Sequence, residues 1–316
     1  MKFAEKYLPN PELTLRDNLW ILRYDLIKWY FMKYFSDNRL LNLSAFRKDA
    51  NLSFLPSPRS HSITNIGYRK REDFRIRKLV DEIGKTNTIF VHQIVAERYS
   101  GLLGQALSDY SGIVIFDPTD GEYAERPPWV GAKSKWVAPH IPNPTTSDGL
   151  CIPIGLPERV NLVTGNPNNL RFVPWENKKN QVLVGPFGNT HYSRQSLALA
   201  SYSSDFYVVP RRVAPRRYYK LLSEFKFVLC PRGNGIDTHR FWETLYSGSV
   251  PIVEKTDWSF YFREHGVPLV ELSSLSDLDS LAEQIRKSYW SKGFDVHDIP
   301  ALKVNYWKKQ INNVWR

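Results

Sequence analysis

The segment from Lys226 to Lys255, KFVLCPRGNGIDTHRFWETLYSGSVPIVEK, determines how we interpret the fold of this chain. Its apolar start, 226–231, predicts a buried strand, and the glycines at 233 and 235 predict a turn. Residues 238–248 have the pattern of a helix that ends at a glycine, and residues 250–254 predict a second buried strand. Strand, helix and strand in this order form the unit of a parallel sheet.

The same alternation continues on both sides of this segment. Further strands are predicted at 87–93, 112–118, 150–157, 181–188, 205–210 and 267–272. Helical patterns lie between most of them, whereas residues 45–68 and 121–149 are expected to be irregular. We therefore expect an α/β protein with doubly wound parallel sheets. The expected divisions are an N-terminal Rossmann-like domain with a helical extension (1–165), a linker (166–180), a second Rossmann-like domain (181–295) and a C-terminal helical segment (296–316).

Composition and charge narrow the class of protein. The chain has 316 residues, enough for two cores, and 42% hydrophobic with 24% charged residues is typical of globular proteins. A net charge of +11 fits an anionic partner, such as nucleic acid, a membrane face or a phosphorylated small molecule, but also a basic protein without one. Two cysteines exclude a disulfide scaffold. The first residues lack the apolar core of a secretory signal, so we expect a cytoplasmic location.

Two loops of the second half carry the residues of a candidate anion site. In open α/β sheets, ligands bind at the carboxyl ends of the strands. The loop GPFGNTHYSR contains Gly188 and ends at Arg194, and the loop PRGNGIDTHR contains Arg232, Gly233 and Arg240. Glycines allow close backbone approach, and arginines bind phosphate. Two such loops at one crevice suit a diphosphate.

Glu243 lies three residues after Arg240, on the same face of the predicted helix. A carboxylate there can accept two hydrogen bonds from a ribose diol while the arginine binds phosphate. The alternative is an ordinary salt bridge between residues i and i+3.

The segment resembles the donor half of the exostosin-type glycosyltransferases (family 47 and its relatives). The matching positions are Phe227, Leu229, Pro231, Gly233, Arg240, Glu243, Gly248, Val250, Pro251 and Ile252. The resemblance implies a GT-B fold, with two Rossmann-like domains facing a cleft. It also implies inverting transfer from a nucleotide-diphosphate sugar to a hydroxyl of a glycan or lipid-linked glycan. The expected donor-binding residues are Gly188, Arg194, Arg232, Gly233, Asn234, Asp237, Thr238, Arg240 and Glu243. Asp237 departs from the family pattern, and could bind donor hydroxyls or cap the helix.

Inverting transfer requires a general base near the acceptor hydroxyl, and a GT-B layout places it in the first domain. The candidates follow predicted strands and are His92, Asp120 and Glu122. The one Asp-x-Asp sequence, Asp277 to Asp279, has the pattern of a helix start, and no Cys or His cluster has zinc spacing. We therefore expect no essential metal and no cofactor besides the nucleotide sugar.

Other functions fit part of these observations. The net charge also fits a nucleic-acid-binding protein, although no known nucleic-acid motif is present. A catalytically inactive sugar-binding protein of the same fold is a further alternative. For the glycosyltransferase, the partners are a nucleotide sugar and a glycan acceptor, not nucleic acid. The amphipathic helix predicted at Leu19–Phe35 would either pack on the protein's own core or, together with the basic run Arg69–Lys78, make peripheral contact with an anionic membrane.

Overall fold

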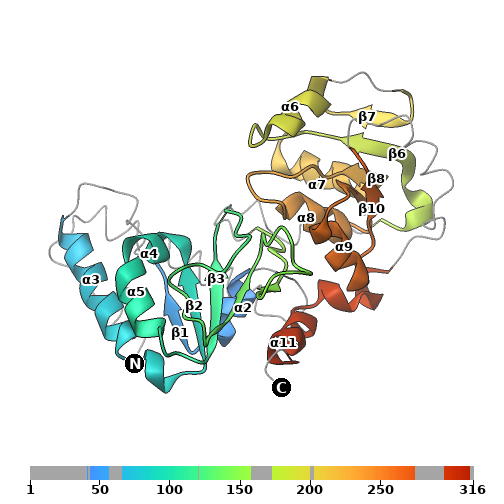
Figure 1. The fold of residues 1–316 in the computed structure, drawn as a ribbon. Helices are drawn as coiled ribbons and strands as arrows, with labels where there is room; N and C mark the ends of the chain where they lie inside the picture. Colours follow the sequence, from blue (N-terminus) through green and yellow to red (C-terminus); the bar gives the residue numbers. More distant parts are fainter. Residues whose placement is uncertain are drawn as a thin grey trace, which may run out of the picture.

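The protein folds around two parallel sheets, each with five strands in the part of the chain that the structure describes (Figure 1). The structure is a computed structural model, and it describes residues 41, 43–56, 66–119, 121–157, 173–199, 203–274 and 295–313. The stretch Leu19–Phe35, the Asp277–Asp279 sequence and residues 166–172 of the predicted linker lie outside these residues. No helix among the described residues is long and apolar enough to cross a membrane.

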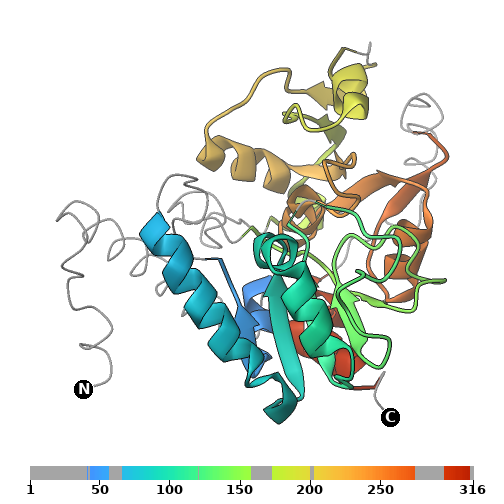
Figure 2. The same cartoon turned by 60° about the vertical axis from the view of Figure 1, so that its left-hand side comes forward.

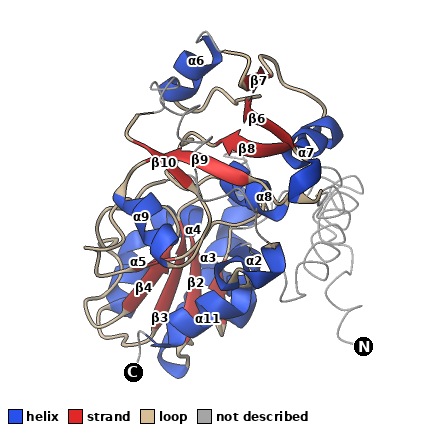
Figure 3. Cartoon of the chain, turned by 90° about the vertical axis from the view of Figure 1, so that its right-hand side faces the viewer, coloured by secondary structure: helices blue, strands red, loops and turns tan. Residues whose placement is uncertain are grey.

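The first sheet keeps its strands in chain order. Its members are β1 (Leu52–Phe54), β2 (Thr88–His92), β3 (Ile113–Asp117), β4 (Lys135–Ala138) and β5 (Leu150–Cys151), and every neighbouring pair is parallel. Three helices connect the first strands, namely α3 (Ile66–Val80), α4 (Gln93–Arg98) and α5 (Ser100–Leu107). They lie on one side of the sheet, and α2 (Leu43–Asp49) lies on the other (Figures 1 and 3).

The second sheet has the strand order β10-β9-β8-β6-β7, all parallel. Its strands are β6 (Lys179–Val184), β7 (Phe206–Val208), β8 (Phe225–Leu229), β9 (Val250–Glu254) and β10 (Val270–Leu272). The chain first moves outward from β6 to β7, then returns past β6 to β8 and continues in the opposite direction. The direction of winding therefore reverses between β6 and β8.

Alternation along the strands of the second sheet builds two cores. Val182 and Val184 of β6 face a smaller core, to which helix α6 (Tyr192–Leu199) contributes Leu197, and Leu183 faces the larger one. The larger core also receives α7 (Pro215–Glu224), α8 (His239–Tyr246) and α9 (Asp257–Glu264). It continues without interruption into the first domain, where it includes Phe116, so the two domains pack directly on each other (Figure 2).

The end of the chain returns to the first domain. Helix α11 (Val304–Asn313) packs on α2, and Lys308 Nζ lies 2.7 Å from Asp49 Oδ2. Trp307 is fully buried in the shared core. Short 3₁₀ turns complete the described structure at Ile83–Lys85, Trp175–Asn177, Val296–Asp298 and Pro300–Leu302. Helix α11 therefore packs the last segment of the chain against the first domain (Figure 3).

The predicted fold class is confirmed, because two Rossmann-like α/β domains with parallel sheets and a C-terminal helix are present. Only the second sheet shows a reversal of winding among the described strands. Parts of the two stretches expected to be irregular are regular. The first contains α2, β1 and the start of α3, and the second contains β4. Strand β1 has three residues, too few to show an alternating pattern.

Candidate functional site

The reversal point of the second sheet brings together the two loops that the sequence singles out. Leu183 of β6 lies beside Val228 of β8, so the loops that follow these strands leave the same edge of the sheet. Gly185 opens the first loop with a φ of +75°, and a Cβ there would lie 2.5 Å from the carbonyl oxygen of Val209. Only glycine fits this position without strain. Ligands of doubly wound sheets bind at this kind of crevice.

Arg240, in the first turn of α8, joins the ends of β6 and β8. Its buried guanidinium donates from Nε to Leu229 O (2.9 Å), from Nη2 to Gly185 O (2.6 Å) and from Nη1 to Pro186 O (3.3 Å). The guanidinium also lies over the ring of Phe187. Arg240 therefore fixes the relative position of the two loops. Its predicted contact with a donor phosphate stays a prediction.

Arg194 of α6 also binds backbone carbonyls, those of the loop after β8. It projects from α6 and donates from Nε to Arg232 O (2.7 Å) and from Nη2 to Pro231 O (3.1 Å). Burial, followed by the charge of Arg240, lowers the pKa of Arg194. The predicted loop glycines lie against it, since a Cβ on Gly233 would come within 3.1 Å of Arg194 Nη2. The two hydrogen bonds of Arg194 thus join α6 to the loop after β8.

Gly188 lies between two guanidinium groups. A Cβ at this position would be 3.6 Å from Arg212 Nη2 and 3.9 Å from Arg194 Nη1. Neither nitrogen has a hydrogen-bond partner among the described residues. Burial, followed by the charges of Arg232 and Arg194, lowers the pKa of nearby His191. The loop after β6 is therefore a region of positive potential with free N–H donors.

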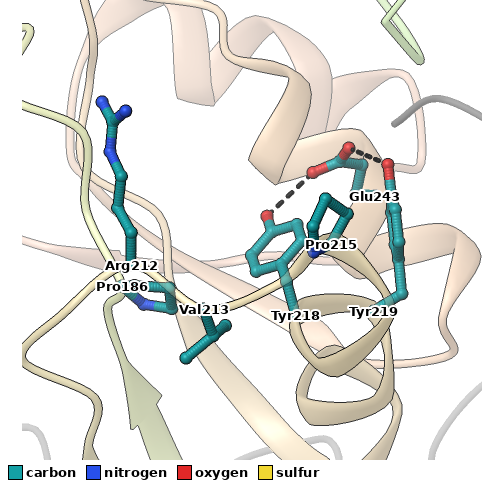
Figure 4. A pocket seen from close by; sticks show the side chains of 7 residues that line it. All are labelled: Pro186, Arg212, Val213, Pro215, Tyr218, Tyr219 and Glu243. Atoms are coloured by element: carbon teal, nitrogen blue, oxygen red, sulfur yellow. Dashed lines mark hydrogen bonds between the residues drawn. The ribbon is translucent and has the colours of Figure 1, made fainter. Parts of the chain in front are cut away.

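Glu243 lies in a pocket beside this region (Figure 4). The residue is 5% exposed, and its carboxylate accepts hydrogen bonds from the hydroxyls of Tyr219 at Oε1 and Tyr218 at Oε2, both at 2.8 Å. Arg240 is not its partner, so the alternative of an i, i+3 salt bridge does not apply. The pocket has a volume of about 150 Å³ and is lined by Pro186, Arg212, Val213, Pro215, Tyr218, Tyr219 and Glu243.

Glu243 is the one lining residue that was predicted, and the pocket also contains three polar side chains that were not. Arg212, Tyr218 and Tyr219 come from RRVAPRRYYK, 211–220, which enters α7. Burial, followed by the charge of Glu243, raises the pKa of Tyr218 well above its ordinary value, so its hydroxyl remains a donor to the carboxylate. Two adjacent tyrosines after a pair of arginines at a helix start are the signal that could have identified this pocket.

Asp237 and its neighbours connect the two domains. Asp237 Oδ2 accepts from the backbone N–H of Ile154 (2.8 Å), and Oδ1 accepts from the indole of Trp242 (2.7 Å). Burial raises the pKa of this carboxyl to about 7. His239 Nδ1 lies 2.8 Å from Gly155 O, and Thr238 precedes α8 without a side-chain capping bond. Both carboxylate oxygens of Asp237 therefore have partners within the protein.

The loop after β8 also contacts the first domain through Gly235. A Cβ there would lie 2.4 Å from Nδ1 of His140, a buried residue with a φ of +60°. The other ring nitrogen of His140 lies 3.0 Å from Thr119 O. Because the imidazole leaves no room for a side chain, a glycine is required at position 235. Asn234 beside it is exposed.

His92 ends β2 and caps the helix that follows. Its Nδ1 accepts from the backbone N–H of Ile94 (3.2 Å), so in the neutral ring Nε2 carries the hydrogen. That nitrogen lies 4.0 Å from Asp117 Oδ2. Neutral His92 in this arrangement has no lone pair left for an acceptor proton. Its assignment as the base stays an untested prediction, which this geometry disfavours.

Of the other two base candidates, Asp120 and Glu122, the structure describes only Glu122. Asp120 lies outside the described residues. Glu122 makes an ion pair with Arg232 of the second domain, so it bridges the two sides of the site. In the part of the chain that is described, no three His, Cys, Asp or Glu side chains gather as they would around a metal ion.

Comparisons with known proteins find similarity among solved structures. No family model and no curated protein matches the sequence. Among solved structures, the chain is similar to AviGT4, a glycosyltransferase involved in avilamycin A biosynthesis, with 12% identity and a TM-score of 0.36. The similarity covers 84% of this chain and 96% of that chain.

Proposed function

We propose that this protein is a glycosyltransferase that binds a nucleoside-diphosphate sugar at the reversal point of its second sheet. The observation that supports this proposal most is the pocket in which the buried Glu243 carboxylate lies beside the arginine-lined loop after β6. A buried carboxylate beside guanidinium groups that keep N–H donors without partners among the described residues suits a ligand that presents hydroxyls and phosphates together. A nucleoside diphosphate has both.

Glu243 has the capacity to bind a ribose diol. A carboxylate offers about four lone-pair sites, and the two tyrosine hydroxyls use two of them. Two sites remain for the 2′- and 3′-hydroxyls of a ribose. The tyrosines also fix the orientation of the carboxylate before a ligand arrives, which lowers the cost of binding.

The diphosphate would lie over Gly188, between Arg212 and Arg194. These guanidinium groups would bind it in the ground state and stabilise the charge of the leaving diphosphate, without an essential metal. The acceptor hydroxyl, from a glycan or lipid-linked glycan, would approach from the first domain, where a base removes its proton. Attack from the side opposite the leaving group would invert the configuration at the sugar's anomeric carbon.

A binding screen tests this proposal. Thermal shift and calorimetry with UDP-, GDP-, CMP- and dTDP-sugars, with and without EDTA, are expected to show that one ribonucleotide class stabilises the protein. Because dTDP contains a 2′-deoxyribose, it is expected to bind more weakly than UDP. Glu243→Gln removes a charged acceptor, and affinity is expected to fall about 10- to 100-fold.

Glu264→Gln is the matched control, since it makes the same charge change at an exposed position near the end of α9. It is expected to bind like the wild type. If no nucleotide sugar binds, and single-stranded RNA binds with a steep salt dependence instead, the assignment is wrong and the positive charge belongs to a nucleic-acid-binding protein.

A further inference from the structure

The ion pair between Arg232 and Glu122 connects the donor side of the site with the acceptor side. Arg232 belongs to the loop after β8, and Glu122 belongs to the loop after β3. The two residues are 110 positions apart in the chain. No other ion pair among the described residues joins these two loops. The inference drawn from it rests on the proposed function.

This pair is accessible to a ligand. The side chain of Arg232 is 33% exposed and that of Glu122 is 25% exposed. Ion pairs with this much exposure are weak, because water screens the charges and both side chains lose freedom. The neighbouring contacts between the domains, Asp237 with Ile154 and Gly235 with His140, are buried. Of these contacts between the domains, the ion pair is therefore the one that a charged ligand can most readily break by binding Arg232.

Arg232 has bonding capacity that the protein does not use. Its Nε is buried and has no hydrogen-bond partner among the described residues. Its backbone is fixed, because its carbonyl oxygen accepts from Arg194 Nε at 2.7 Å. A buried N–H without an acceptor is costly, and an oxygen of a diphosphate would satisfy it. Arg232 is thus held beside the anion site while its outer nitrogen binds Glu122.

Glu122 is also the described base candidate best placed to receive a proton. His92 uses Nδ1 to cap α4, and Asp117 Oδ1 accepts from the N–H of Thr119 at 2.9 Å. Among the described residues, the hydrogen-bond partner of Glu122 is Arg232 alone. While the pair is formed, Arg232 Nη2 holds Oε1 of Glu122, so this oxygen is not available to an acceptor hydroxyl. Release from Arg232 would free it.

We propose that Glu122 is the general base and that Arg232 restrains it until the donor diphosphate binds Arg232. In the transfer step, the released carboxylate takes the proton of the acceptor hydroxyl. The acceptor oxygen then forms a bond to the anomeric carbon, and the bond from that carbon to the diphosphate oxygen breaks. Its electron pair leaves with the nucleoside diphosphate, and protonated Glu122 returns its proton to water. The base is therefore available only when a donor is in place.

Two measurements on Glu122→Gln test this coupling. Calorimetric titration with UDP, GDP and inorganic pyrophosphate measures whether the carboxylate competes for Arg232. The variant is expected to bind the best of these ligands at least threefold more tightly than the wild type does. Sugar transfer to water from the best donor of the screen is expected to fall at least 100-fold, the usual contribution of a general base.

Control variants separate this role from a general effect of charge. Glu125→Gln makes the same charge change at an exposed position in the same loop, and is expected to match the wild type in both measurements. Arg232→Gln is expected to weaken binding of the same ligands at least tenfold. Formate, as an external carboxylate, is expected to restore part of the transfer by Glu122→Ala.

Three results would overturn the coupling. Ligand binding by Glu122→Gln that equals that of Glu125→Gln would show that the carboxylate does not restrain Arg232. Transfer by Glu122→Gln within tenfold of the wild type would exclude Glu122 as the base. Unchanged ligand binding by Arg232→Gln would exclude Arg232 from the anion site. A wild-type protein that binds none of the nucleotide sugars would contradict the proposed function itself, whatever the Glu122 variants do.

Discussion

The two sheets of this protein share their strand number and direction among the described residues, but not their winding. In the first sheet, the spatial order of the strands follows the chain, whereas the second reverses between β6 and β8. A reversal sends the two neighbouring connections to opposite faces and opens a crevice at the carboxyl ends of the strands. The backbone topology of the second sheet alone therefore provides a crevice in which a ligand can bind.

The side chains at the carboxyl ends of the two sheets also differ in their chemistry. The edge of the second sheet carries Arg194, Arg212 and Arg240, whose positive charges suit phosphate. The edge of the first carries the titratable side chains His92, Asp117 and Glu122. For the proposed sugar transfer, the relative position of these two edges therefore matters.

The largest effect is expected at the reversal point, from Arg240→Met. Methionine fills a similar volume but leaves the carbonyl oxygens of Leu229 and Gly185 without their donor. Buried acceptors without partners cost about 1–3 kcal/mol each, so the free energy of unfolding is expected to fall by about 3 kcal/mol or more. Urea unfolding followed by circular dichroism measures this loss.

Arg216→Met is the control for Arg240→Met. Arg216 lies exposed at the start of α7, where a substitution is expected to change stability by less than about 0.5 kcal/mol. If both variants unfold at the same urea concentration, Arg240 does not join β6 and β8 in solution. The reversal point would then be held together by the sheet alone.

A smaller effect is expected where the edges touch, from Gly235→Ala. The added Cβ would lie 2.4 Å from the His140 ring, too close for real atoms, so one of the two loops must move. Overpacking of this kind costs about 1–3 kcal/mol, and differential scanning calorimetry would show a lower melting temperature. Gly84→Ala, where no atom lies within 4 Å of the added carbon, is the control. Equal melting temperatures would mean that the domains lie further apart in solution.

The sequence predicts the local elements of this fold better than their arrangement. Apolar runs such as 226–229 and 250–253 are long enough to identify strands, and the glycines after them mark the loops. Strand order is different, because nothing in a single sequence states which strands are neighbours. The reversal between β6 and β8 therefore emerged only from the structure, although it determines where a ligand can bind.

The site shows the same limit at the level of single residues. Arg240 and Glu243 belong to one helix turn and were identified from their spacing, but their partners come from other segments. Arg240 binds backbone carbonyls more than 50 residues away, and Glu243 binds the tyrosines of α7. The residue type alone does not distinguish a guanidinium that binds phosphate from one that binds backbone carbonyls.

The smallest effect is expected from Asp237→Asn, which changes how the contact between the domains responds to pH. Burial raises the pKa of Asp237 in the folded protein to about 7, compared with an ordinary value of 3.8. A folded state with the higher pKa binds the proton more tightly than the unfolded chain does. The contribution of this group is therefore complete below about pH 4 and is lost as the pH rises through about 7.

Asparagine does not titrate, so the variant lacks this loss between pH 4 and 7. Its Nδ2 cannot accept from the N–H of Ile154, so at pH 5 the variant is expected to be less stable than the wild type by about 1 kcal/mol. The difference is expected to shrink toward pH 8, where the wild type has to bury a charged carboxylate. Urea unfolding of both proteins at pH 5, 6, 7 and 8 measures it. A constant difference across this range would show that Asp237 stays ionised in the folded protein, and that its two hydrogen bonds outweigh the cost of burying the charge.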